Sequence, residues 1–174
     1  IATLKHPEMV GLNPEFAHEQ MAGINFVHVV AEALEAGKLF HIDLNDQEVG
    51  RFDQDLRFGS QSYKDAFFLV KLLVDAKYAG PKHFDSHAYR SSDYNDVKEF
   101  ARGSMRTYKI LEAKAHAFNS DPVIQGLLKD IVREDRKLAS LVGKYTSKNA
   151  AALLATEFDR AALAARPLPY EKLD

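Results

Sequence analysis

An α/β fold with a parallel sheet is predicted by three features of this sequence. Short apolar segments alternate three times with longer segments that carry apolar residues at helical spacing, and a long helical tail follows. Helices that connect neighbouring strands pack on the faces of a parallel sheet. The 174 residues are 46% hydrophobic and 28% charged, which is typical of a globular protein with one ordinary core.

Composition excludes several classes of protein. The net charge is −2 and no basic block occurs, so we expect no nucleic-acid partner. No cysteine is present, which excludes disulfides, thiolate nucleophiles and cysteine-based metal sites, and is compatible with a cytoplasmic location. No secretory signal is visible, and charges interrupt every apolar stretch well before bilayer length, so we expect no membrane partner.

The first strand and helix are expected within residues 10–36. Residues 1–9 are predicted as the end of a preceding helix, because the residue before Pro7 is pushed out of the α region. Residues 10–13 are predicted to form the first strand. Helical spacing over residues 21–36 predicts one helix, and Gly37 fits its C-terminal cap.

The second unit begins with a strand at residues 38–43, in which Leu39, Phe40 and Ile42 are expected to be buried. Residues 65–78 are strongly amphipathic and are predicted to form its helix. The residues expected to face the core are Phe67, Phe68, Val70, Leu72, Leu73 and Val74.

The third strand is predicted at residues 82–85. Asp93 or Asn95 can cap a long helix that runs to about residue 118. Asp121, followed by proline, is predicted to start a further helix that ends near residue 141. The remaining alanine-rich sequence is predicted to be helical in pieces.

Three parallel strands are too few to close a barrel, and they leave two edges with backbone groups open to pairing. The chain also begins without an initiator methionine. We therefore expect a fragment or processed product of a larger sheet. Alone, it should be unstable or self-associating, and the tail from Asp121 onward should pack mainly on another subunit.

Each predicted strand ends in a potential metal ligand: Glu15, Asp43 and Asp85 follow the three strands. Parallel α/β proteins place their chemistry at this end of the strands. His18 lies three residues after Glu15, so a carboxylate and an imidazole can share an ion on one side of a helix.

Asp53 and Asp55 lie two residues apart in the acidic loop that follows the second strand. In an extended segment both side chains would point the same way and could bind one cation. A mostly oxygen site with one nitrogen suits Mg²⁺ or Mn²⁺ better than zinc, and six ligands accommodate two ions more easily than one. The six candidate metal ligands are Glu15, His18, Asp43, Asp53, Asp55 and Asp85.

Other interpretations of these residues remain open. The acidic loop is also compatible with a solvated turn, because Asp and Asn are ordinary turn formers. His41 and His83 each lie two residues before the terminal Asp of a strand, on the same side as that Asp, and are expected to be hydrogen-bonded structural histidines. His28 and His116, within helices, are assigned the same role. No phosphate-binding glycine loop and no Ser–His–Asp spacing occurs.

Five segments of the chain closely resemble xylose isomerase, a family of sugar isomerases. They are GLNPE at 11–15, HEQM at 18–21, GKLFHIDLN at 37–45, DQDLRFG at 53–59 and HFD at 83–85. They come in the family's order with compatible spacing, and weaker similarity extends through nearly the whole chain. A sugar epimerase or a phosphodiester-cleaving barrel is a weaker alternative, because the DQDLR pattern is so specific to isomerases.

The resemblance implies a (β/α)₈ TIM barrel whose last three βα units are residues 1–119. Residues 120–174 would be the helical tail that makes subunit contacts in a homotetramer. The implied reaction interconverts D-xylose and D-xylulose, and also D-glucose and D-fructose, by a metal-assisted hydride shift. Two divalent cations are implied, with Mg²⁺ favoured and Mn²⁺ or Co²⁺ also suitable.

The resemblance also implies a role for each candidate ligand. Glu15 would bridge the two ions, Asp43 and Asp85 would bind the structural ion, and His18, Asp53 and Asp55 would bind the catalytic one. No catalytic residue beyond these ligands is expected in this chain.

The family's first five strands are missing from this chain, and the upstream catalytic residues are missing with them. The chain contains no tryptophan, and His87 stands where the family carries a lysine. The expected partners are therefore an aldose or ketose sugar and the N-terminal half of the barrel. An inactive half-barrel that binds metal or assembles without catalysis is the alternative.

Overall fold

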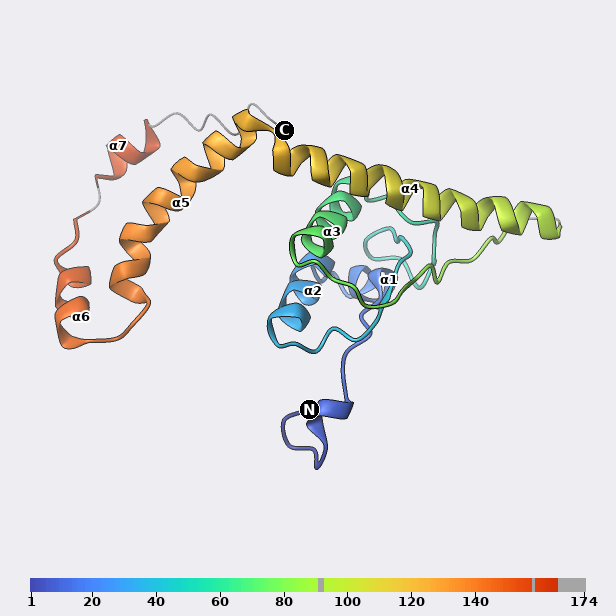
Figure 1. Ribbon diagram of the computed structural model, residues 1–174, viewed down its shortest axis with the longest axis horizontal. Helices are drawn as coiled ribbons and strands as arrows, with labels where there is room; N and C mark the ends of the chain where they lie inside the picture. The colour runs from blue at the N-terminus through green and yellow to red at the C-terminus, as the bar shows by residue number, and fades with distance from the viewer. Residues whose placement is uncertain (91–92, 158, 166–174) are drawn as a thin grey trace. The chain divides into compact units, whose positions relative to one another are not determined.

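The computed structural model describes residues 1–90, 93–157 and 159–165. Two compact units divide the chain, the first at Ile1–Ala117 and the second from Phe118 onward. Figure 1 shows the order of the helices and strands along the chain.

A small parallel sheet lies at the centre of the first unit. Strand β1, Ile42–Asp43, pairs with β2, Lys82–His83, so that Asp43 lies opposite His83. Parallel bridges at Leu12–Leu39 and Glu15–Asp43 place the first predicted strand on the other side of β1. The three segments therefore run parallel and side by side in chain order.

The strands are shorter than the sequence predicts. Residues 10–13 form only bridges, because the Leu12 carbonyl accepts from both Phe40 and His41 instead of continuing a regular ladder. Phe40, predicted to be buried, is 45% exposed. Its ring covers Gly11, where an added Cβ would lie 2.1 Å from Phe40 Cγ. The first segment thus approaches β1 closely over a glycine.

The helix predicted at residues 21–36 begins later, as α2 at Phe26–Glu35, and a separate short helix, α1 at Phe16–Met21, precedes it. Gly23 has a φ of 73°, a left-handed conformation that ends the first helix. Asn25 then caps the second, accepting a hydrogen bond from the backbone of His28 at 3.0 Å. Gly37, with a φ of 62°, follows the end of α2 as predicted.

The start of the chain also differs from the prediction, since it contains a 3₁₀ helix, η1, at Pro7–Met9 rather than the end of an α-helix. Helix α3 spans Tyr63–Asp75 and lies beside α2 (Figure 1). The expectation that Phe68 faces the core is wrong, because it is 40% exposed. Val70 and Leu73 are buried as predicted, and Phe67, Leu72 and Val74 pack partly buried against the core. Ala66 and Leu69 complete the buried face of α3.

The apolar core of the first unit joins β1 to the inner faces of its helices. Burying one large apolar side chain contributes about 1.5–3 kcal/mol, so this cluster is the main source of stability. Its largest fully buried members are Phe16, Phe26, Val30, Ile42, Leu44, Phe58, Leu69, Val70 and Leu111.

Helix α4, Tyr94–Ser120, adds Leu111 and Ala115 to this core. Of the two predicted caps, Asp93 is the one that acts: its Oδ1 accepts from the backbone N–H groups of Asn95 at 2.8 Å and Asp96 at 3.0 Å.

The second unit contains α5 at Pro122–Val142, α6 at Ser147–Leu154 and α7 at Arg160–Ala164. Asp121 caps α5 as predicted, accepting from the backbone of Val123 at 2.8 Å. Helices α5 and α6 pack against each other. No helix among the described residues is both long and apolar enough to cross a bilayer.

Candidate metal centre

Three carboxylates meet at the carboxyl ends of the parallel segments. A parallel β-bridge pairs Glu15 with Asp43. Asp43 also lies opposite His83 on β2, and Asp85 follows His83 by two residues. Glu15, Asp43 and Asp85 each offer an oxygen, and these oxygens lie within 4.8 Å of one another. The parallel arrangement brings together residues that are 70 positions apart in the chain.

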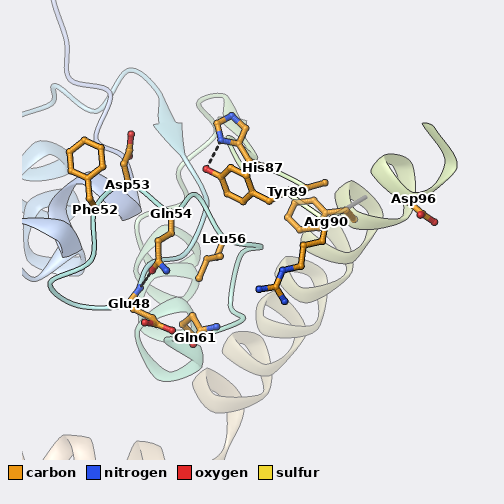
Figure 2. A pocket seen from close by; sticks show the side chains of 12 residues that line it. Glu48, Phe52, Asp53, Gln54, Leu56, Gln61, His87, Tyr89, Arg90 and Asp96 are labelled. Carbon is orange, nitrogen blue, oxygen red and sulfur yellow. Dashed lines mark hydrogen bonds between the residues drawn. The ribbon is translucent and has the colours of Figure 1, made fainter. Parts of the chain in front are cut away.

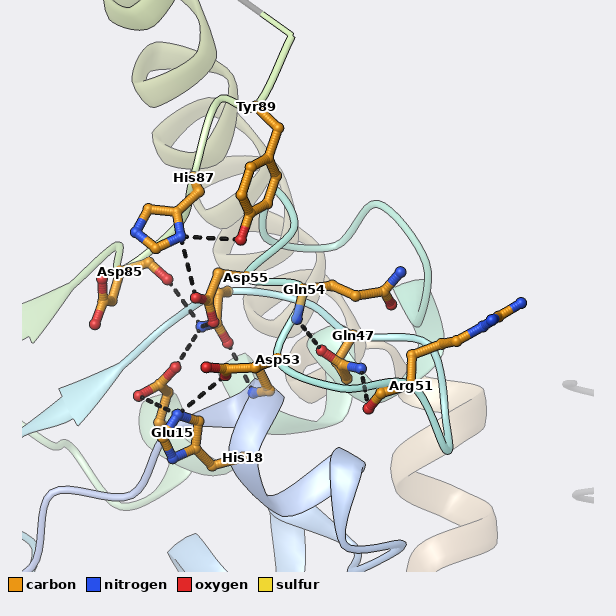
Figure 3. A network of polar contacts seen from close by, with 12 residues as sticks. Glu15, His18, Gln47, Arg51, Asp53, Gln54, Asp55, Asp85, His87 and Tyr89 are labelled. Atoms are coloured by element: carbon orange, nitrogen blue, oxygen red, sulfur yellow. Dashed lines mark hydrogen bonds and ion pairs between the residues drawn. The ribbon is translucent and has the colours of Figure 1, made fainter.

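A second group shares Glu15 with the first. His18 Nε2 lies 3.5 Å from Glu15 Oε2, on the first turns of α1, and 3.2 Å from Asp53 Oδ1 (Figure 3). Glu15, His18 and Asp53 thus form another set of ligand atoms that lie within 4.8 Å of one another. Glu15 belongs to both groups, so its carboxylate can contribute a ligand atom to each.

The loop that carries Asp53 and Asp55 is not extended, so the predicted basis for their pairing is wrong. Their φ angles are 36° and 43°, both in the left-handed region that Asp tolerates better than most residues. Figure 3 shows Asp53 directed toward His18 and Asp55 toward His87. The two carboxylates thus reach the site along different directions rather than from one side of a strand.

Asn45 links the loop to the ends of the strands, although the sequence analysis did not single it out. Its buried Nδ2 lies 2.8 Å from Glu15 Oε1 and 3.0 Å from Asp55 Oδ1. The same nitrogen lies 2.8 Å from the Asp85 carbonyl, and Oδ1 accepts from the backbone of Ala17 at 2.8 Å. Its position two residues after Asp43 was the signal that could have identified it, because an extended chain returns a side chain to the same side every second residue.

Asp46, also missed, closes the base of the loop. Its backbone exchanges two hydrogen bonds of 2.8 Å with Leu56. Its carboxylate accepts from the backbone N–H groups of Gln61 at 2.8 Å, Ser62 at 3.1 Å and Gln47 at 2.8 Å. Its buried side chain therefore ties both ends of the loop to the start of α3.

Gln47 holds the middle of the same loop. Its Oε1 accepts from the backbone of Gln54 at 2.7 Å, and its Nε2 donates to the carbonyls of Arg51 at 2.8 Å and Glu48 at 3.0 Å. The side chain is fully buried. Asp53 is therefore held between residues whose backbone groups are fixed from inside the loop.

The crowded carboxylates favour a bound proton or cation. Burial raises the pKa of Glu15 above its ordinary value of 4.5, and the hydrogen bond from Asn45 opposes this only in part. Burial also raises the pKa of Asp55, and the nearby negative charge of Asp53 raises it further. Within the described part of the chain, the buried Asp53 Oδ1 accepts no hydrogen bond. An oxygen-rich set with one imidazole and an unsatisfied oxygen fits a divalent cation.

His87 also contacts this site. Its Nδ1 lies 3.2 Å from Asp55 Oδ2 and 3.1 Å from the Tyr89 hydroxyl, and its backbone donates to the Asp55 carbonyl at 2.8 Å. The segment after β2 is thereby attached to the acidic loop. His87 and Asp53 also border a hollow of about 900 Å³, whose wall continues to Arg90 (Figure 2).

No family model matches the chain. Over its whole length, however, it is 53% identical to a xylose isomerase from Thermus caldophilus, of which it covers 45%. It is 65% identical over 128 residues to a xylose isomerase from Thermus thermophilus, a match that includes 74% of the chain and 33% of that protein. With a xylose isomerase from Streptomyces lividans the identity is 47% over 179 positions, covering all of the chain and 44% of that protein. The chain spans about half the length of the curated relatives it matches.

Proposed function

Because the chain corresponds over its whole length to the C-terminal portion of xylose isomerase, we propose that it is part of a metal-dependent aldose–ketose isomerase. Its reaction would interconvert D-xylose and D-xylulose, and also D-glucose and D-fructose. The observation that best supports this is the position of Glu15, which lies in both ligand groups at the carboxyl ends of the parallel segments. These homologues imply a TIM-barrel fold, and we propose that the chain forms its last three βα units.

The proposed cofactors are two divalent cations, Mg²⁺ first, with Mn²⁺ or Co²⁺ as substitutes. When bound, they would act as Lewis acids that polarise oxygens of the sugar. Glu15 would bridge them, Asp43 and Asp85 would bind one, and His18 with Asp53 and Asp55 would bind the other. The mostly oxygen donors and the raised carboxyl pKa values of Glu15 and Asp55 support this assignment.

Neighbouring residues of the chain hold the proposed ligands in position. Asn45 donates toward Glu15 and Asp55 and so restricts the orientation of both carboxylates. His87 contacts the other oxygen of Asp55. Prepositioned ligands lose little conformational freedom when a cation or a sugar binds, which strengthens binding in the required geometry.

The proposed partners are the N-terminal half of the barrel and further copies of the subunit. In the described part of the chain, no strand pairs with the outer side of β2, and that edge would accept a neighbouring strand of the barrel. The helices from α5 onward would contact another subunit of a homotetramer. A half-barrel that binds cations or assembles without catalysis is the second candidate, favoured by ligand groups that this chain's own residues form.

The test is reconstitution of activity. The chain would be mixed with the N-terminal segment of the Thermus caldophilus relative, and conversion of D-xylose to D-xylulose would be followed with Mg²⁺. Activity in the mixture and its absence from either part alone is expected. Asp55→Asn should abolish it, whereas Asp75→Asn on the outer part of α3 should not. An assembled mixture, verified by sedimentation, that shows no activity would favour the second candidate.

A further inference from the structure

His41 immediately precedes β1, and His83 lies on the neighbouring strand β2, so both are close to Asp43. The register places Asp43 opposite His83, and the two imidazole rings meet edge to face with their centroids 4.4 Å apart. His41 Nε2 lies 3.5 Å from Asp43 Oδ1. Each of the three residues offers one ligand atom, and these atoms lie within 4.8 Å of one another.

His41 is not the hydrogen-bonded structural histidine that its sequence position suggests. Its Nε2 is buried and has no hydrogen-bond partner among the described residues. Buried polar atoms are nearly always hydrogen-bonded, so an exception at a group that also ligates metals requires an explanation. Here the unsatisfied nitrogen lies near both a carboxylate oxygen and a second imidazole.

We propose that His41, His83 and Asp43 form a further binding site, which shares Asp43 with the carboxylate site and takes a transition-metal ion of the class of Zn²⁺ or Cu²⁺. Two imidazole nitrogens and one carboxylate oxygen are a donor set that such ions prefer and that Mg²⁺ does not. Ligand bonds of about 2.0–2.1 Å require the donor atoms to close to about 3.3 Å from one another. His83 is exposed, so its side chain is free to make this adjustment.

The two classes of ion compete for Asp43. Its Oδ1 faces His41, whereas its Oδ2 accepts from Asn13 Nδ2 at 2.8 Å. An ion held by the two histidines binds the Asp43 oxygen that does not accept from Asn13. Asp43 is then less available to a cation that Glu15 and Asp85 hold. Zn²⁺ or Cu²⁺ therefore weakens Mg²⁺ binding at the carboxylate site. This competition rests on the proposed function, but the histidine site does not.

The test uses one equivalent of Cu²⁺ on the untagged 174-residue chain, followed by electron paramagnetic resonance. The expected spectrum shows hyperfine splitting from two imidazole nitrogens. His41→Gln and His83→Gln should each weaken Cu²⁺ binding at least tenfold and remove the two-nitrogen pattern. The matched control is His28→Gln, because His28 Nε2 also lies near a carboxylate, 3.3 Å from Glu32 on the outside of α2, and this variant should change nothing.

His18 provides the discriminating outcome. Copper at the carboxylate site would show a single nitrogen, and that signal would disappear in His18→Gln. A one-nitrogen spectrum of this kind, or Cu²⁺ affinity unchanged in His41→Gln, overturns the proposal. If a variant fails to fold, imidazole ¹⁵N spectra of the unmodified chain titrated with Zn²⁺ give the same decision. Joint shifts of His41 and His83 support the site, and shifts of neither overturn it.

Discussion

Asp46 shows how a single buried residue can determine a site to which it contributes no ligand. Its carboxylate accepts three backbone hydrogen bonds, from Gln47, Gln61 and Ser62. All three partners are N–H donors, so both oxygens of Asp46 must act as acceptors. An asparagine at this position would replace one of these oxygens with a second donor. The geometry of the loop with Asp53 and Asp55 therefore depends on the charge state of a residue at its base.

Asp46→Asn should lower the free energy of unfolding by about 1.5–3 kcal/mol, since an –NH₂ group would face backbone donors. The variant should also bind divalent cations more weakly, because the loop with Asp53 and Asp55 loses the hydrogen bonds that Asp46 accepts. Urea denaturation of the chain assembled with its N-terminal complement measures the first effect. The matched control is Asp75→Asn on α3. Its free energy of unfolding should lie within about 0.5 kcal/mol of that of the unmodified chain, as is usual for a substitution on the surface. Equal stability of the two variants would contradict this account of Asp46.

Cation binding should release protons at acidic pH. The raised pKa values of Glu15 and Asp55 mean that the folded chain without cations holds protons at pH values above the ordinary carboxyl range. The unfolded chain has already lost these protons there, so the folded state without cations loses stability as pH rises through this interval. A divalent cation must displace the protons, and its affinity should fall as pH is lowered.

Calorimetry measures this release. Mg²⁺ binding would be titrated at one acidic pH in two buffers that differ in ionisation enthalpy, and the apparent heats should differ in proportion to the protons released. Glu15→Gln should reduce the difference. Identical heats in both buffers would show that the carboxylates bind the cation without losing a proton.

The sequence predicts the charged ligands better than it predicts the residues that hold them in place. Glu15, Asp43 and Asp85 could be placed because each follows an apolar segment. Asn45 and Asp46 were missed because their function depends on groups brought near by the fold, such as the backbones of Ala17 and Gln61. A local pattern does not contain those contacts.

Among secondary-structure elements, the helix ends were the most predictable features. Asp93, Asp121 and Gly37 act within one turn of their own positions, so the sequence near them carries the signal. Strand length was not predictable, because the number of ladder hydrogen bonds depends on a neighbouring segment. The break between α1 and α2 was missed because Gly23 lies inside an otherwise helical pattern.

Asp121→Ala should loosen the start of α5 by about 1 kcal/mol, because the backbone N–H groups of Val123 and Ile124 lose their acceptor. Hydrogen exchange at those two amides should accelerate about fivefold. The amide of Asn149, which Thr146 caps at the start of α6, is the internal control and should not change. Unchanged exchange at Val123 would show that the cap does not limit opening of this helix end.

The first unit presents apolar surface that a closed barrel or a partner would cover. In the first unit Phe52 is 84% and Met9 75% exposed, and the outer edge of β2 has no strand beside it among the described residues. Such a surface drives association. The chain alone should therefore self-associate in sedimentation velocity, and adding the N-terminal complement should convert it to a defined assembly. A cooperatively melting monomer would contradict this prediction.

The stoichiometry of bound Mn²⁺ in the assembled protein tests whether two cations share Glu15, because Glu15 lies in both ligand groups. Mn²⁺ counted by electron paramagnetic resonance should reach two per chain. Glu15→Gln should weaken both sites, whereas Asp85→Asn should weaken only one. One Mn²⁺ per chain, or two that remain tightly bound in Glu15→Gln, would contradict a shared two-cation centre at the ends of these strands.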